Sequence, residues 1–315
     1  MNAMHDPHLT APLAPFGGER PPAPEWFGRA LAQTPERRFV AVEGAAIEVL
    51  IWEPAQAPRR PALLLMHGSG AHADWWSFIA PFLAHERRVV AFSWSGMGRS
   101  DWRTRYSRAL FVREALAVAE ATGLCADGPP ILVGHSFGGR VALALTAAHG
   151  DQVRAAIIVD PPVFAPDRVR PERPADREFK PHRVYPTFAA AMARFRFAPV
   201  QPCANLFIAD HIARCGLREA EGGGWTWRFD SFLRRDLERE DPAPTLRAIR
   251  RPVALIRGGA SKLMRAEDAA HMRSLLAPGS PYFEIPEADH HVMVDQPLAF
   301  VAGLQGLLAN WPARG

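Results

Sequence analysis

The chain has few cysteines and no long apolar runs, and both absences narrow what it can be. Its 315 residues include three cysteines, Cys125, Cys203 and Cys215, which form no CxxC pair and have no metal-ligand spacing. This sparse, odd number fits a reducing cytoplasm better than a disulfide framework. No run of about 18 apolar residues lacks a charge, so no membrane span is expected. The first 26 residues are rich in proline and lack the apolar segment of a secretory signal. We therefore expect a cytoplasmic protein.

Long blocks of one charge are also missing. The net charge of +4 comes from 37 basic and 33 acidic residues that are interspersed, and no Lys/Arg block is longer than a pair. This pattern indicates a mixed surface rather than a nucleic-acid footprint. We therefore expect a small-molecule substrate, and neither nucleic acid nor membrane as a partner. We expect no metal and no other cofactor, and the sequence is compatible with a homodimer.

Short apolar runs alternate with helical patterns along most of the chain. Residues 37–54 alternate apolar and polar side chains around a Glu-Gly turn, which predicts an antiparallel hairpin. The later alternation of strand and helix predicts an α/β class protein with a mostly parallel, doubly wound sheet. The expected strands lie within 61–68, 89–94, 129–136, 154–162, 251–259 and 280–291, and the expected helices within 74–86, 106–123, 137–150 and 296–311.

Residues 161–245 interrupt this alternation. They are rich in proline, arginine and aromatic residues, and contain helix-like pieces but no buried-strand run. We therefore predict three parts, which are a flexible N-terminal leader (1–25), an α/β core (26–160 and 246–315) and a helical cap or lid (161–245).

One pentapeptide that carries chemistry lies between an expected strand and an expected helix. Gly134-His135-Ser136-Phe137-Gly138 has the pattern G-x-S-x-G in the strand–turn–helix context of a nucleophile elbow. In such an elbow the serine sits on a sharp turn, and the glycines let strand and helix approach closely. The helix N-terminus behind the serine favours developing negative charge. The pentapeptide also occurs by chance in glycine-rich turns, so the interpretation depends on the flanking strand and helix.

Two loops complete the candidate site. The sequence HGSG at 67–70 ends the first parallel strand, where the backbone N–H of Ser69 (or Gly70) can join that of Phe137 in a two-donor oxyanion hole. A plain glycine-rich turn is the alternative interpretation of this loop. The segment 288–297 follows the last expected strand and precedes the last helix, which is a suitable place for a catalytic base.

From about residue 38 to residue 311 the chain resembles the α/β-hydrolase superfamily. The resemblance implies an α/β-hydrolase fold and a Ser–His–acid hydrolase in which Ser136 attacks, His290 is the base and residues 161–245 form the cap. The matching segments are HGSG at 67–70, SGMGRSD at 95–101, GHSFGG at 134–139 and ADHHVMVDQP at 288–297.

Two adjacent histidines compete for the role of base. Members of the superfamily commonly place the catalytic histidine five residues before an acidic residue that starts an EQP-like helix. The sequence DQP at 295–297 matches that start, and counting back five residues leads to His290 rather than His291. We expect His291 to pack or hydrogen-bond beneath the loop, and His67 and His135 to be structural supports.

The acidic partner of the histidine is missing from its usual place. Many members supply it as G-x-x-D after the penultimate strand, but residues 258–261 read GGAS, and Ser261 carries no charge. Glu267 and Asp268 lie further on and would need a rearranged loop. A minority of the superfamily takes the acid one strand earlier, and there the chain has Asp160 at the end of an expected strand. We predict Asp160 as the acid, and the alternative is a solvated aspartate that closes a strand.

A serine nucleophile indicates acyl chemistry, whereas a carboxylate would suit a C–halogen or epoxide bond. We therefore predict that Ser136 attacks a small carboxylic ester or lactone and forms an acyl-enzyme. The aromatic residues of the predicted cap suggest a hydrophobic or aromatic substrate, although such residues more often simply pack. Two alternatives stay open. One is a C–C bond hydrolase of the meta-cleavage type, in which HGSG is also found, and the other is a non-catalytic ligand receptor with this fold.

Overall fold

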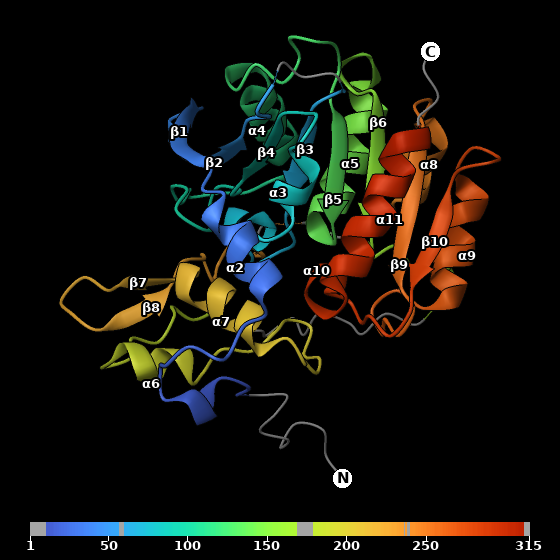
Figure 1. Cartoon of the computed structure of the whole chain (residues 1–315). Coiled ribbons are helices and arrows are strands. Elements are labelled where there is room, and N and C mark those ends of the chain that lie inside the picture. Colours follow the sequence, from blue (N-terminus) through green and yellow to red (C-terminus); the bar gives the residue numbers. More distant parts are fainter. Residues whose placement is uncertain (1–10, 57–59, 169–178, 236, 238–239, 312–315) are drawn as a thin grey trace.

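The computed structural model describes residues 11–56, 60–168, 179–235, 237 and 240–311. Its centre is an eight-stranded sheet in the order β1-β2-β4-β3-β5-β6-β9-β10 (Figure 1). From β4 to β10 neighbouring strands are parallel, while β2 pairs antiparallel with both β1 and β4. The predicted α/β class with a mostly parallel sheet is therefore confirmed. The strands are β1 (Glu36–Val42), β2 (Ala45–Trp52), β3 (Leu63–Met66), β4 (Val89–Phe92), β5 (Ile131–His135), β6 (Ala155–Val159), β9 (Val253–Gly258) and β10 (Tyr282–Ile285).

Helices cover both faces of the sheet because alternate residues of each central strand point to opposite sides. Leu63 and Leu65 of β3 enter one apolar cluster, and Leu64 and Met66 enter the other. Both faces are buried, as expected for a parallel sheet between helical layers. The helices outside the predicted cap are α2 (Glu25–Ala32), α3 (Ala80–Leu83), α4 (Arg108–Ala121), α5 (Phe137–Ala148), α9 (Ala266–Leu275), α10 (Val292–Asp295) and α11 (Pro297–Asn310), with 3-10 turns η2 (Ala14–Phe16), η3 (Ala73–Trp76) and η4 (Gly150–Gln152). Helix α8 (Ala243–Ala248) crosses the boundary predicted between cap and core.

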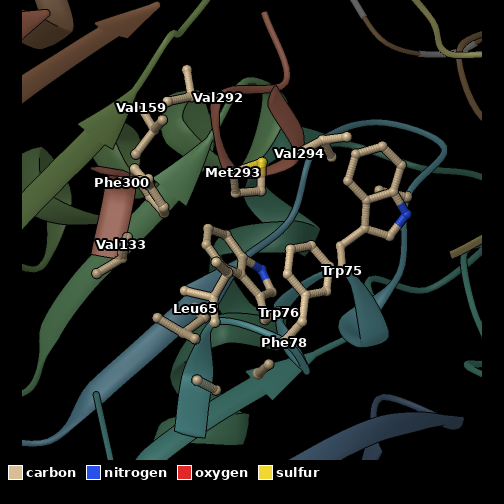
Figure 2. Close-up of a cluster of buried hydrophobic side chains, with 14 of the residues drawn as sticks. Leu65, Trp75, Trp76, Phe78, Val133, Val159, Val292, Met293, Val294 and Phe300 are labelled. Carbon is tan, nitrogen blue, oxygen red and sulfur yellow. The ribbon is translucent and has the colours of Figure 1, made fainter. Parts of the chain in front are cut away.

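The first of these clusters also supports the loop that ends at α10. Figure 2 shows Leu65, Val133 and Val159, from three adjacent strands, gathered with Trp76 and Phe300. These five side chains are at most 1% exposed, and burying each one contributes about 1.5–3 kcal/mol. The residues of α10 complete the same cluster, so the segment that carries the candidate base rests on the core.

The expected helix at 74–86 is instead two short pieces, η3 and α3. Pro81 lies in the first turn of α3, where its missing N–H costs nothing, but a proline deep inside a longer helix would break the hydrogen-bond ladder. The chain therefore turns between Trp76 and Ala80. Within the part of the chain that the structure covers, no helix has both the length and the apolar character needed to cross a bilayer.

The predicted cap stretch, 161–245, contains strands as well as helices in its described part. Helices α6 (Phe188–Met192) and α7 (Leu206–Cys215) are followed by an antiparallel pair, β7 (Leu217–Glu219) and β8 (Trp225–Trp227). Three consecutive glycines at 222–224, all with positive φ, make the tight turn between the two strands. In Figure 1 these elements lie together at the lower left, beside α2.

The leader was predicted to be flexible, and its first ten residues lie outside the described ones. The remainder contains η2 and buries Leu13, which is 2% exposed and belongs to the first cluster. The Arg214 side chain, from the last turn of α7, also donates a hydrogen bond to the carbonyl of Gly18. This part of the leader is therefore packed on the fold, because a buried leucine anchors it.

Two glycines, Gly134 and Gly138, allow the strand–helix contact behind Ser136. A Cβ at Gly138 would lie 2.6 Å from the carbonyl oxygen of His67 and still closer to that of Met66. A Cβ at Gly134 would lie 2.7 Å from the Gly138 carbonyl oxygen. Backbone atoms cannot move away cheaply, so α5 can pack this closely only without side chains here.

We therefore expect Gly138→Ala to lower the free energy of unfolding by about 3 kcal/mol, the upper range for overpacking a dense core. The matched control is Gly306→Ala in the exposed face of α11, where a Cβ would meet nothing within 4 Å. That change should raise stability by up to about 1 kcal/mol, because alanine favours a helix interior. Urea unfolding of both variants measures the difference, and equal stabilities would contradict the packing argument.

Candidate active site

Ser136 lies on the sharp turn between β5 and α5. Its backbone has φ 53° and ψ −115°, a strained conformation for a residue with a side chain. A serine before a helix usually caps it with its hydroxyl oxygen, but Ser136 makes no such bond. Its side chain instead hydrogen-bonds His290. The strand–turn–helix context predicted from G-x-S-x-G is therefore present, and the turn directs the hydroxyl away from the helix.

His290 lies in the loop between β10 and α10. Its Nε2 is 2.9 Å from Ser136 Oγ, and its Nδ1 is 2.7 Å from Asp160 Oδ2. Because a carboxylate accepts, Nδ1 carries the proton and Nε2 offers a lone pair to the serine hydroxyl. The ring of His291 has no hydrogen bond within the described residues. The structure thus brings His290, and not its neighbour, to the serine.

Asp160 follows β6 at the carboxyl edge of the sheet and has no exposed surface. Its Oδ1 accepts the Gly258 N–H at 3.0 Å, and its Oδ2 accepts the Ser261 hydroxyl at 2.7 Å. Gly258 is the last residue of β9 and Ser261 lies just after it, and β9 pairs with β6. Ser261, the residue at the place where an acid was missing, therefore hydrogen-bonds the acid supplied by the neighbouring strand.

The two other carboxylates considered from the sequence have different surroundings. Asp268 forms an ion pair with Arg168 and accepts the N–H of Arg265 at 2.9 Å, which caps α9. Glu267 lies in the first turn of the same helix and is exposed. Neither has a hydrogen bond to His290 within the described residues, so Asp160 is the carboxylate that reaches the ring.

Burial sets the protonation of this hydrogen-bonded series. Desolvation lowers the pKa of His290 to about 3, so its ring is neutral at neutral pH and Nε2 can take up a proton. Desolvation raises the pKa of Asp160, whereas the hydrogen bonds from Ser261 and Gly258 lower it by stabilising the carboxylate. The arrangement can accept the Ser136 proton and hold the resulting imidazolium against Asp160.

The HGSG loop follows β3, the strand beside β5. Its Gly70 N–H donates to Met97 Sδ at 3.1 Å, which leaves Ser69 as the better of the two predicted loop donors. Phe137 is the first residue of α5, and the first N–H groups of a helix have no intrahelical partner. Ser69 follows the end of β3, and Phe137 follows Ser136 at the end of β5. The two predicted oxyanion donors therefore lie at the ends of neighbouring strands.

Several polar contacts that the sequence analysis missed hold the histidine loop. The Asp295 carboxylate accepts the Asp289 N–H at 2.8 Å and the Gln201 amide at 2.8 and 2.9 Å. Gln201 Oε1 accepts the His291 N–H at 3.0 Å, and Asn205 Nδ2 donates to the Asp295 carbonyl at 3.0 Å. Gln201 and Asn205 come from the predicted cap. No local pattern marks either residue, so only the folded chain reveals them.

The family model for the alpha/beta hydrolase family matches residues 63–304. The chain belongs to this family. The match spans the elbow, the HGSG loop and the histidine loop, and the predicted α/β-hydrolase fold is confirmed.

Named relatives of this alpha/beta hydrolase act on different substrates. This chain is 27% identical over 278 residues to the esterase Rv0045c of Mycobacterium tuberculosis. The alignment covers 85% of this chain and 88% of the esterase. A shorter segment is 38% identical to part of a 2-hydroxymuconate semialdehyde hydrolase from Pseudomonas sp.. This alignment covers 31% of this chain and 35% of that hydrolase. The solved structure of E-2-(acetamidomethylene)succinate hydrolase has a TM-score of 0.70 at 21% identity, covering 87% of this chain and 99% of that one, and shows the shared fold. The esterase, similar over most of both chains, supports the expectation of an ester hydrolase.

Ser261→Ala tests the contact between the loop and the acid. Removing the hydroxyl takes away a hydrogen bond that stabilises the ionised Asp160, and such bonds contribute about 1.5–3 kcal/mol. The Asp160–His290 pair should then take up a proton at higher pH, which moves the acid limb of kcat/KM upward by about one unit. The pH profile of ester hydrolysis measures this shift.

The matched control is Ser274→Ala, at an exposed serine in α9 that hydrogen-bonds only the carbonyl of His271 in the described residues. Its acid limb should coincide with that of the wild type. An acid limb that is unmoved, or moved downward, in Ser261→Ala would show that the hydroxyl does not stabilise the carboxylate.

Proposed function

We propose that the protein is a serine hydrolase that cleaves a small carboxylic ester or lactone through an acyl-enzyme. The observation that carries this proposal is the hydrogen-bonded series Ser136–His290–Asp160, with the Nε2 lone pair of a neutral ring 2.9 Å from the serine oxygen. Such a pair generates the nucleophile that ester cleavage needs. The similarity to an esterase over most of both chains supports the same reaction.

The proposed reaction follows from the placement of these groups. Ser136 Oγ attacks the carbonyl carbon while its proton passes to His290 Nε2, and Asp160 stabilises the imidazolium. The N–H groups of Ser69 and Phe137 stabilise the oxyanion of the tetrahedral intermediate. The alcohol leaves with the proton from His290, and a water molecule then attacks the acyl-enzyme by the same route to release the acid.

Aromatic rings near the site favour a hydrophobic or aromatic substrate. The ring of Phe197, from the predicted cap, lies 5.1 Å from that of His291, and the ring of Trp75 lies 5.2 Å away from it. Other cap aromatics pack on each other, as Phe188 and Trp225 do. We propose that residues 161–245 cover the site and that Phe197 contributes to its apolar wall.

C–C bond cleavage is the second candidate. It is favoured by the local similarity to the 2-hydroxymuconate semialdehyde hydrolase and by the HGSG loop. The third reading, a non-catalytic receptor, fits poorly, because a receptor does not require a strained serine hydrogen-bonded to a neutral histidine. A substrate panel of short and aromatic esters, lactones and vinylogous diketones separates ester from C–C chemistry.

Wild-type protein should turn over p-nitrophenyl esters and label with a fluorophosphonate, and Ser136→Ala should do neither. The loss of kcat should exceed about 10⁴-fold, because removing a nucleophile leaves only binding and oxyanion stabilisation. Mass spectrometry of the labelled protein locates the adduct. Absence of turnover and of labelling in the wild type would refute the hydrolase proposal.

Asp160→Asn tests the assignment of the acid. An amide cannot hold the ring tautomer and the imidazolium as a carboxylate does, so kcat should fall on the order of 10⁴-fold with KM little changed. Asp268→Asn is the control, since Asp268 pairs with Arg168 and caps α9, and it should affect stability more than kcat. A near-wild-type kcat for Asp160→Asn would assign the role to another carboxylate.

A further inference from the structure

Three buried histidines meet beside Ser136. His135 ends β5, and His290 and His291 lie in the loop before α10. One ring nitrogen from each lies within 4.8 Å of the other two, and the ring centroids are 4.8, 4.9 and 5.5 Å apart. The three side chains are at most 4% exposed. Imidazoles gathered in this way resemble the donor set of a transition-metal site.

The hydrogen bonds of two rings leave a lone pair available on each. His135 Nε2 lies 2.9 Å from the carbonyl oxygen of His290, and a carbonyl only accepts, so Nε2 carries the proton and Nδ1 has the lone pair. His290 donates Nδ1–H to Asp160, which leaves its lone pair on Nε2. Histidine ligands of metals usually donate their second N–H to a carbonyl or a carboxylate in this manner. The outer hydrogen bonds of two ligands are therefore already in place.

The third ring supplies the observation that points to a ligand. Both ring nitrogens of His291 are buried without a hydrogen-bond partner within the described residues. Leaving a buried polar group unsatisfied costs about 1–3 kcal/mol. The aromatic rings of Trp75 and Phe197 pack against His291. The imidazole thus keeps a nitrogen available to a bound group, and a ring nitrogen of His291 lies within 4.8 Å of one from each of the other two rings.

We propose that His135, His290 and His291 form a binding site for a divalent transition metal of borderline softness, Zn²⁺ or Cu²⁺, and that the bound metal inhibits the enzyme. Imidazole nitrogens suit both ions. Inhibition follows because the metal takes the His290 lone pair that must accept the serine proton. The binding stands on the three rings alone, whereas the inhibition rests on the proposed hydrolase function.

Burial opposes metal binding because desolvation penalises the cation, and the Asp160 carboxylate behind His290 offsets part of that penalty. Zn–N bonds of about 2.0–2.1 Å place tetrahedral ligands about 3.3 Å apart, and the three ring nitrogens lie within 4.8 Å of one another, so the rings must move closer by up to about 1.5 Å. Ser136 Oγ, 2.9 Å from His290 Nε2, offers an oxygen beside the three nitrogens.

Direct binding tests the site independently of catalysis. Metal-free full-length protein and its Ser136→Ala variant should each bind one Zn²⁺ by isothermal titration calorimetry, and His291→Phe should weaken binding at least tenfold. His291→Gln is a second variant in case the larger ring disturbs folding, which circular dichroism reports. The control is His85→Ala, at an exposed histidine, and its binding should be unchanged. Absence of binding, or equal affinity in both His291 variants, would overturn the site.

Spectroscopy and kinetics complete the test. Co²⁺ bound in place of Zn²⁺ should give d–d bands without a thiolate charge-transfer band, whereas a thiolate band would assign the metal to a cysteine and overturn the proposal. Zn²⁺ should inhibit wild-type ester hydrolysis reversibly, with activity restored by EDTA, and the inhibitory concentration should rise at least tenfold in His291→Gln relative to its own uninhibited rate. Binding through His291 without inhibition would overturn the inhibitory role. Absence of ester turnover in metal-free protein would instead count against the hydrolase proposal.

Discussion

The carboxylate of Asp160 is fully buried and accepts hydrogen bonds from three donors, and the geometry of the site depends on these bonds. Removing a carboxylate from water costs several kcal/mol even after the protein relaxes. The donors that offset this cost are the Gly258 N–H, the Ser261 hydroxyl and His290 Nδ1. Gly258 ends β9 and Ser261 lies just after it. The pairing of β6 with β9 must therefore hold for these two donors to reach the buried carboxylate. A carboxylate held in this way then fixes both the tautomer and the orientation of His290.

The same sheet edge maintains the strain at Ser136 and Asp160. Both residues have positive φ, at 53° and 45°, and each such conformation costs on the order of 1–3 kcal/mol. The sheet hydrogen bonds nevertheless continue up to both residues, since the Ser136 N–H donates to Val159 and the Asp160 N–H donates to Ile256. Adjacent parallel strands thus end in two forced turns that direct a hydroxyl and a carboxylate toward one imidazole. Relaxing either turn would require breaking a bond of the ladder.

The residues that sequence reasoning located are those whose local patterns carry their own physical requirement. The glycines around Ser136 are needed for close strand–helix approach, and Asp160 is recognisable because it ends an uninterrupted apolar strand. Gln201 had no such pattern, because its role depends on Asp295, 94 residues away in sequence. Leu13 had no such pattern either, since a proline-rich segment gives no sign of the core that covers it. Periodicity identifies elements, but contacts between distant irregular segments become visible only when the chain is folded.

The expectation of no metal was drawn from the spacing of the cysteines, and each histidine was considered only within its own motif. His135 belongs to the elbow and His290 to the histidine loop, so their rings lie close together only in the folded chain. A general base requires a neutral imidazole whose second nitrogen is hydrogen-bonded to a fixed acceptor, and a metal ligand requires the same thing. The burial that keeps His290 neutral therefore favours both roles. The two roles exclude each other, because a single lone pair on His290 Nε2 cannot bind a metal and accept the serine proton together.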